Sequence, residues 1–96
     1  MSGSDGSRSY LVECYWPGVD EQKLCVVVRR AQAAAHELRR KGRHVELVGA
    51  IYVPGDETVF CLFDGLEADV RTVSERADVP FERVLESLRI EARAGR

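Results

Sequence analysis

The order of strand-like and helix-like segments is the feature that most constrains how this chain folds. Two segments repeat apolar residues at helical spacing, and four are rich in the aromatic and β-branched residues that favour strands. In order they are 10–16 (strand), 20–42 (helix with its caps), 44–53 and 58–63 (strands), 67–77 (helix) and 83–91 (strand). Because βαβ crossovers are right-handed, this order predicts a ferredoxin-like α+β fold. We expect one four-stranded antiparallel sheet with both helices on one face.

Capping and turn residues mark the ends of these segments. Asp20 is placed to cap the first helix, and Gly42 to end it, because glycine readily adopts a left-handed conformation. The Pro-Gly-Asp sequence at 54–56 predicts the turn of a hairpin, with Gly55 taking the positive φ. Asp78 stands where the second helix ends, and aspartate tolerates a positive φ better than most residues.

The chain length of 96 residues corresponds to one domain. We place the domain at 10–92, after a Ser- and Gly-rich segment, 1–9, that we expect to be disordered. Residues 93–96 are expected to form a loose tail. A chain of this size buries only a little over ~60% of its unfolded surface. Its core is therefore thin unless a partner extends it.

Composition excludes several classes of protein. The net charge of −2 leaves no basic excess for binding phosphates, which argues against nucleic acid as a partner. No apolar stretch approaches the ~20 residues that span a membrane. The first nine residues lack the apolar core of a signal peptide, so we expect a cytoplasmic protein. The three cysteines form no CxxC pair, which argues against a disulfide framework or a structural zinc site.

The strands do not alternate cleanly between apolar and polar residues. The segment 59–63 is apolar on both faces, although two helices can cover only one face of the sheet. An uncovered apolar face of this size usually indicates a partner, and pairing by two-fold symmetry is the commonest arrangement. We therefore expect a homodimer that forms through the open sheet face, as in dimeric α+β barrels.

Glu13 interrupts an otherwise apolar strand, where a carboxylate is costly unless it is paired or bound to a ligand. Alternation places it with Leu11 and Tyr15. We expect this to be the open face, because charges avoid the side that packs on helices. Two interpretations stay open: Glu13 binds an Arg or Tyr across the dimer, or it contacts a ligand.

Three further residues, Glu46, Tyr52 and Glu86, could lie near Glu13, but the register of the strands is not determined by the sequence. Together they would form an oxygen-rich site that binds a divalent cation or orients a small polar ligand. We take Glu13 and Glu86 as candidate metal ligands. Tyr15 and Tyr52 are the candidate ligand-binding residues.

Cysteine and histidine side chains indicate no stronger site. Cys14 and Cys61 fall on adjacent strands, where we expect small buried side chains. Cys25 and His36 lie ~16 Å apart along the first helix, too far to bind one metal ion. His44 is alone at the start of a strand. We find no nucleophile triad, P-loop or dinucleotide motif, so no catalytic residue is assigned.

Several short motifs extend over nearly the whole folded chain. They are Tyr-Leu-Val-Glu at 10–13, Pro-Gly-Val at 17–19, Ile-Tyr-Val-Pro-Gly-Asp-Glu-Thr at 51–58, Phe-Cys-Leu-Phe-Asp at 60–64, Arg-Ala-Asp-Val-Pro-Phe at 76–81 and Arg-Val at 83–84. In these motifs the chain resembles a small actinobacterial family of ferredoxin-like domains of unknown function, one member of which binds nickel. The resemblance implies a dimer, with nickel or another divalent metal as cofactor. Many members have His at the position of Gly49, so a metal site that uses this His lacks one ligand here.

Three functions are consistent with these features. The leading one is a cytoplasmic dimeric module that binds a divalent metal or a small molecule between its two sheets. The alternative is a cofactor-free oxygenase or cyclase of the dimeric α+β-barrel type, by analogy of fold. Such an enzyme needs an acid or base such as Glu13 in a closed cavity. The third is a structural dimerisation domain, in which Glu13 is satisfied by an Arg or Tyr partner.

Overall fold

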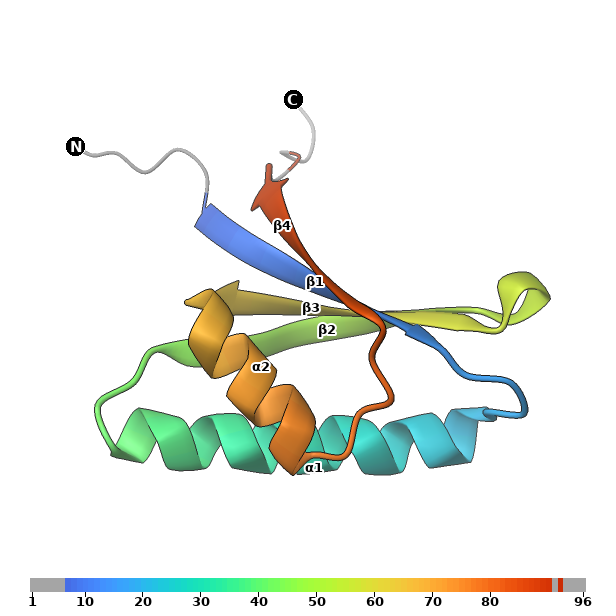
Figure 1. Cartoon of the computed structure of the whole chain (residues 1–96), viewed down its shortest axis with the longest axis horizontal. Helices are drawn as coiled ribbons and strands as arrows, with labels where there is room; N and C mark the ends of the chain where they lie inside the picture. Colours follow the sequence, from blue (N-terminus) through green and yellow to red (C-terminus); the bar gives the residue numbers. More distant parts are fainter. Residues whose placement is uncertain (1–6, 91, 93–96) are drawn as a thin grey trace.

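The computed structural model describes residues 7–90 and 92. Within these residues the elements follow the expected order (Figure 1). They are β1 (Ser7–Tyr15), α1 (Glu21–Arg40), β2 (Val45–Val53), the short 3₁₀ helix η1 (Pro54–Asp56), β3 (Thr58–Gly65), α2 (Glu67–Arg76) and β4 (Arg83–Arg89). The predicted ferredoxin-like α+β fold is confirmed.

The four strands form one antiparallel sheet in the order β2-β3-β1-β4. β1 therefore lies inside the sheet between β3 and β4, and β2 and β4 are its edges. α1 packs on β2, and α2 packs on α1 and reaches β3 and β4 (Figure 1). Both helices cover the same face, and no described residue covers the other.

The hydrophobic core lies between the sheet and the two helices. β1 and β3 contribute alternate side chains that are at most 2% exposed, namely Val12, Cys14, Val59, Cys61 and Phe63. The helices contribute Val27, Ala31, Ala35 and Leu38 from α1, and Val70 and Val73 from α2. Each fully buried Val or Phe contributes roughly 1.5–3 kcal/mol, so these contacts are the main favourable term in folding.

The predicted helix caps are confirmed. The side chain of Asp20 accepts a hydrogen bond of 2.7 Å from the backbone N–H of Lys23, which satisfies one of the free donors at the start of α1. Beyond the other end of α1, Gly42 has a φ of +88°. Asp78, after α2, has a φ of +61°, as its position suggested.

The hairpin turn between β2 and β3 differs from the prediction in one respect. The residue with positive φ is Glu57, at +51°, and not Gly55. Residues 54–56 instead form a 3₁₀ turn, which is closed by a 3.1 Å hydrogen bond from the Glu57 N–H to the Pro54 carbonyl. The φ near −65° that proline presets also suits a 3₁₀ turn, and here Glu57 takes the left-handed conformation at its C-terminal end.

The sheet begins earlier than predicted, because β1 starts at Ser7 and not at Tyr10. Residues 7–9 therefore belong to the domain and not to a disordered segment. In the register, Ser9 lies opposite Asp64 of β3 and Ser87 of β4, so cross-strand pairing extends the strand into polar sequence. Residues 1–6 and 93–96 lie outside the described part of the chain, and so does the predicted end of β4 at residue 91.

Gly65, the last residue of β3, has a backbone conformation and surroundings that leave no room for a side chain. Its φ is +135°, and a Cβ there would clash with the backbone carbonyl oxygen of His44. This close approach joins the end of β3 to the start of β2, where Gly65 lies opposite Val45. Glycine is therefore required both for its conformation and for its small size.

We expect Gly65→Ala to lower the free energy of unfolding by about 1–3 kcal/mol, because it combines a strained φ with a steric clash. Gly55→Ala is the control, since a Cβ at Gly55 meets nothing within 4 Å. Its effect should stay within about 0.5 kcal/mol. Urea unfolding followed by circular dichroism measures both values, and equal stability of the two variants would contradict the prediction.

Candidate functional site

The open face of the sheet carries a group of apolar side chains. Leu11 of β1 lies directly opposite Leu62 of β3 and Leu85 of β4. In the next row, Phe60 of β3 lies opposite Ile51 of β2, whose side chain is 64% exposed. Residues opposite one another share a face, so these five side chains form one surface, which we call the open-face patch. No described element of the chain covers it.

Glu13 lies on this face with Leu11 and Tyr15, as expected from alternation. Its Oε1 atom accepts hydrogen bonds from Nη2 and Nε of Arg83, at 2.6 and 2.8 Å. Arg83 lies directly opposite Glu13 in the register of β1 and β4. The side chain of Glu13 is 26% exposed and that of Arg83 is 63% exposed. The partner of Glu13 is therefore an arginine of the same chain.

A polar cluster lies at the other end of the open face. The hydroxyl of Ser9 donates a 2.7 Å hydrogen bond to Oδ1 of Asp64, and Nη2 of Arg89 lies 3.0 Å from Oδ2. Ser9 is fully buried. Sequence reasoning missed this cluster, because it considered Asp64 only as part of the motif at 60–64. The three residues come from three strands, so they meet only when the register is known.

The two other candidate carboxylates do not join Glu13. Glu86 lies opposite Tyr10, which is buried on the helix-covered face, so Glu86 is on the face opposite to Glu13. Glu46 is on the open face, but it lies opposite Asp64. That row is four residues along the sheet from Glu13, or ~13 Å. The structure thus separates the residues proposed to share a cation.

The two candidate tyrosines also lie apart. Tyr15 is on the open face and is 53% exposed. Tyr52 is on the helix-covered face opposite Val59, and its hydroxyl donates to the carbonyl of Val19 at 3.1 Å. The cause is a β-bulge in β2 between Leu47 and Gly49. One extra residue reverses the alternation of side chains after it, which moves Tyr52 away from the face that carries Glu46.

Metal-ligating side chains do not cluster in the described part of the chain. No three His, Cys, Asp or Glu side chains there are close enough to hold a metal ion. Cys14 and Cys61 are buried on the helix-covered face, as expected of small core residues. A hydrogen bond with Cys61, together with burial, raises the pKa of Cys14, so this thiol stays protonated.

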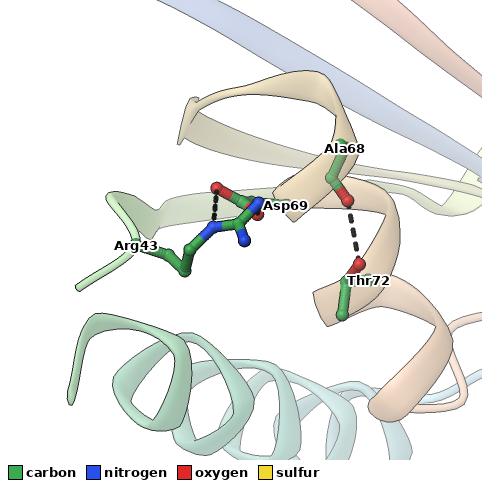
Figure 2. A network of polar contacts seen from close by, with 4 residues as sticks. All are labelled: Arg43, Ala68, Asp69 and Thr72. Carbon is green, nitrogen blue, oxygen red and sulfur yellow. Dashed lines mark hydrogen bonds and ion pairs between the residues drawn. The ribbon is translucent and has the colours of Figure 1, made fainter. Parts of the chain in front are cut away.

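A buried carboxylate that sequence reasoning missed is Asp69, in the first turn of α2. Its side chain is 3% exposed, and its Oδ1 and Oδ2 atoms lie 2.7 and 3.4 Å from Nη2 and Nε of Arg43 (Figure 2). Arg43 lies in the loop between α1 and β2, so this ion pair connects that loop to α2. In the same helix, the hydroxyl of Thr72 donates to the carbonyl of Ala68 at 2.9 Å. The ion pair thus joins two segments of the chain, whereas the Thr72 hydrogen bond lies within α2, and we assign a structural role to both.

No family model matches this chain, and no curated protein is similar to it in sequence. None of the helices in the described residues is long and apolar enough to cross a membrane. The resemblance of the short motifs to a family with one nickel-binding member therefore stays an expectation.

In the folded protein, we expect only Cys25 to react with monobromobimane at neutral pH. Cys25 is exposed, whereas Cys14 and Cys61 are 1% and 2% exposed. All three thiols should react after unfolding in urea, as counted by mass spectrometry. Cys25→Ser is the control and should remove labelling of the folded chain. Rapid labelling of Cys14 or Cys61 in the native state would disagree with this arrangement.

Proposed function

We propose that this chain is a self-associating binding module, in which the open sheet face packs on the same face of a second copy. The open-face patch is the observation that carries the proposal, because no described element covers it. The opposite face already packs on two helices and forms a core. Apolar surface that remains after the core has formed is stabilised by contact with another protein surface.

A second copy suits this face for two reasons. A two-fold axis brings the patch onto itself, so the rows of Leu and Phe side chains meet apolar rows of the partner. The charges beside the patch are already compensated, because Glu13 and Arg83 form an ion pair within one chain. Burial of a paired carboxylate costs less than burial of an unpaired one.

Binding of a cation or a small polar ligand between the paired sheets is the narrower form of this proposal. Glu13 and Tyr15 would supply a carboxylate and a phenol at the interface. Glu86 and Tyr52 lie on the other face, so a metal ion would need Glu13 from both copies. Nickel is the ion implied by the family resemblance. Each Glu13 would also have to leave Arg83, so the geometry supports association more strongly than metal binding.

Leu62→Lys is expected to convert a dimer into a monomer at micromolar concentration. A lysine in the centre of the patch would be buried without a partner, which should weaken association by about 100-fold or more. Val26→Lys on α1 is the control, because Val26 is an apolar residue 46% exposed away from the sheet. Light scattering after gel filtration measures the mass of each variant. A monomeric wild-type protein at tens of micromolar would refute the proposal.

Metal analysis tests separately whether a cation binds between the paired sheets. If a cation binds there, protein purified without an affinity tag or chelator contains a divalent metal, and calorimetric titration with Ni²⁺ shows binding. Glu13→Ala should abolish this binding, whereas Glu86→Ala should leave it unchanged, because Glu86 is on the other face. A wild-type protein that binds no metal, or a Glu13→Ala variant that binds it equally, would exclude the metal and leave the dimer.

A further inference from the structure

A groove of about 750 Å³ lies between the first half of α1 and the end of β2, on the helix-covered side of the sheet. Figure 1 shows α1 running beside β2, which is one of the two edge strands of the sheet. We propose that this groove binds a small amphiphilic carboxylate. The acyl or aromatic body of the ligand lies in the groove, and its carboxylate contacts Arg29. This site is separate from the open-face patch and does not rest on self-association.

Apolar side chains form the floor and one wall of the groove. Leu24 and Val28 lie one turn apart on α1, at the half-buried margin of the core. Ala50 and Tyr52 are alternate residues of β2 and face α1. Because the Tyr52 hydroxyl donates to the carbonyl of Val19, its ring is held in one position as a rigid wall. The volume falls within the range of roughly 300–1,000 Å³ that is typical of sites for small molecules.

Donor groups at one end of the groove indicate an anionic ligand. Arg29 and Gln32 line the groove and lie three residues apart, on one side of α1. Neither side chain makes a hydrogen bond or ion pair with another described residue. A guanidinium group offers paired donors that match the geometry of a carboxylate, and the Gln32 amide can donate another hydrogen bond. The unpaired donors and the apolar floor together fit an amphiphilic acid.

Glu21 sets the direction of the ligand. It lines the other end of the groove, eight residues before Arg29, which corresponds to ~12 Å along α1. Glu21 is the first residue of α1, where the positive end of the helix dipole already stabilises its carboxylate. A ligand carboxylate is repelled at this end and attracted at the other, so the apolar body of the ligand lies toward Glu21.

The edge strand favours a small molecule over an added peptide strand. A peptide that extends the sheet needs a regular row of free backbone groups along β2. The β-bulge between Leu47 and Gly49 interrupts this regular pattern in the middle of β2. Bulges of this kind are a common protection of sheet edges against strand addition. The groove itself borders only the second half of β2, from Ala50 to Pro54.

Cys25 provides the readout for the test. Its exposed thiol lines the groove one turn before Arg29, so a bound ligand should shield it. The experiment measures the rate at which iodoacetamide alkylates Cys25 in the full chain, with sodium decanoate added below its micelle concentration. Decanoate should slow alkylation several-fold at saturation, whereas decanol, which has the same apolar chain and no charge, should not at the same concentration. No protection, or equal protection by both amphiphiles, would overturn the proposal.

Two matched pairs of variants locate the site. Arg29→Gln should weaken protection by decanoate about tenfold, the value of one lost charge-assisted hydrogen bond. Arg76→Gln, at the exposed end of α2, should have no effect. Ala50→Phe should fill the groove and prevent binding, whereas Ala33→Phe on the exposed side of α1 should not. Unchanged affinity in Arg29→Gln would overturn the assignment.

A peptide control completes the test. An extended decapeptide that shifts backbone amide resonances along β2, without any effect of decanoate, would assign the groove to strand addition and overturn the proposal. Decanoate that shifts the resonances of Val28, Arg29 and Tyr52 in the wild type supports it. The mass of the protein, measured in the same samples, shows whether loss of binding accompanies loss of the dimer. This separates failure of the groove proposal from failure of self-association.

Discussion

Pairing of β1 with a neighbour on each side is the constraint on which the rest of the structure depends. Because β1 lies between β3 and β4, its register assigns every second side chain to one face of the sheet. Val12 and Cys14 enter the core and are at most 1% exposed, whereas Leu11 and Glu13 lie on the open face. A slip of one residue would exchange these sets and bury the carboxylate of Glu13 among apolar side chains. Burial of the core therefore specifies the register of the whole sheet.

The same arrangement separates two surfaces that can act independently. The open-face patch lies on one side of the sheet, and the groove lies on the other, between α1 and β2. Ala31 and Ala35 are buried because their small side chains let the second half of α1 lie close to the core. Leu24 and Val28, in the first half, stay half-buried and border the groove. Association through the sheet would thus leave the groove open to a ligand.

Much of the local structure could be predicted, because its signals depend on neighbours in the chain. The caps at Asp20, Gly42 and Asp78 follow from the conformations that these residue types tolerate. The face that carries Glu13 follows from simple alternation in β1. The position of Tyr52 does not, because the bulge in β2 reverses the alternation. A bulge depends on how two strands align, and no short sequence pattern in β2 marked it.

The sequence by itself determined the order of the elements, most of their ends and the presence of an apolar face that two helices cannot cover. These features follow from periodicity, turn chemistry and chain length. Each of them can be read from neighbouring residues or from the total number of residues, without knowing which distant segments meet. Only the tertiary structure decided which polar groups meet. Glu13 and Arg83 are 70 positions apart, and Ser9 and Asp64 are 55 apart. Such pairs form because packing of the core aligns distant strands, and that alignment is a property of the whole sheet and of no single segment.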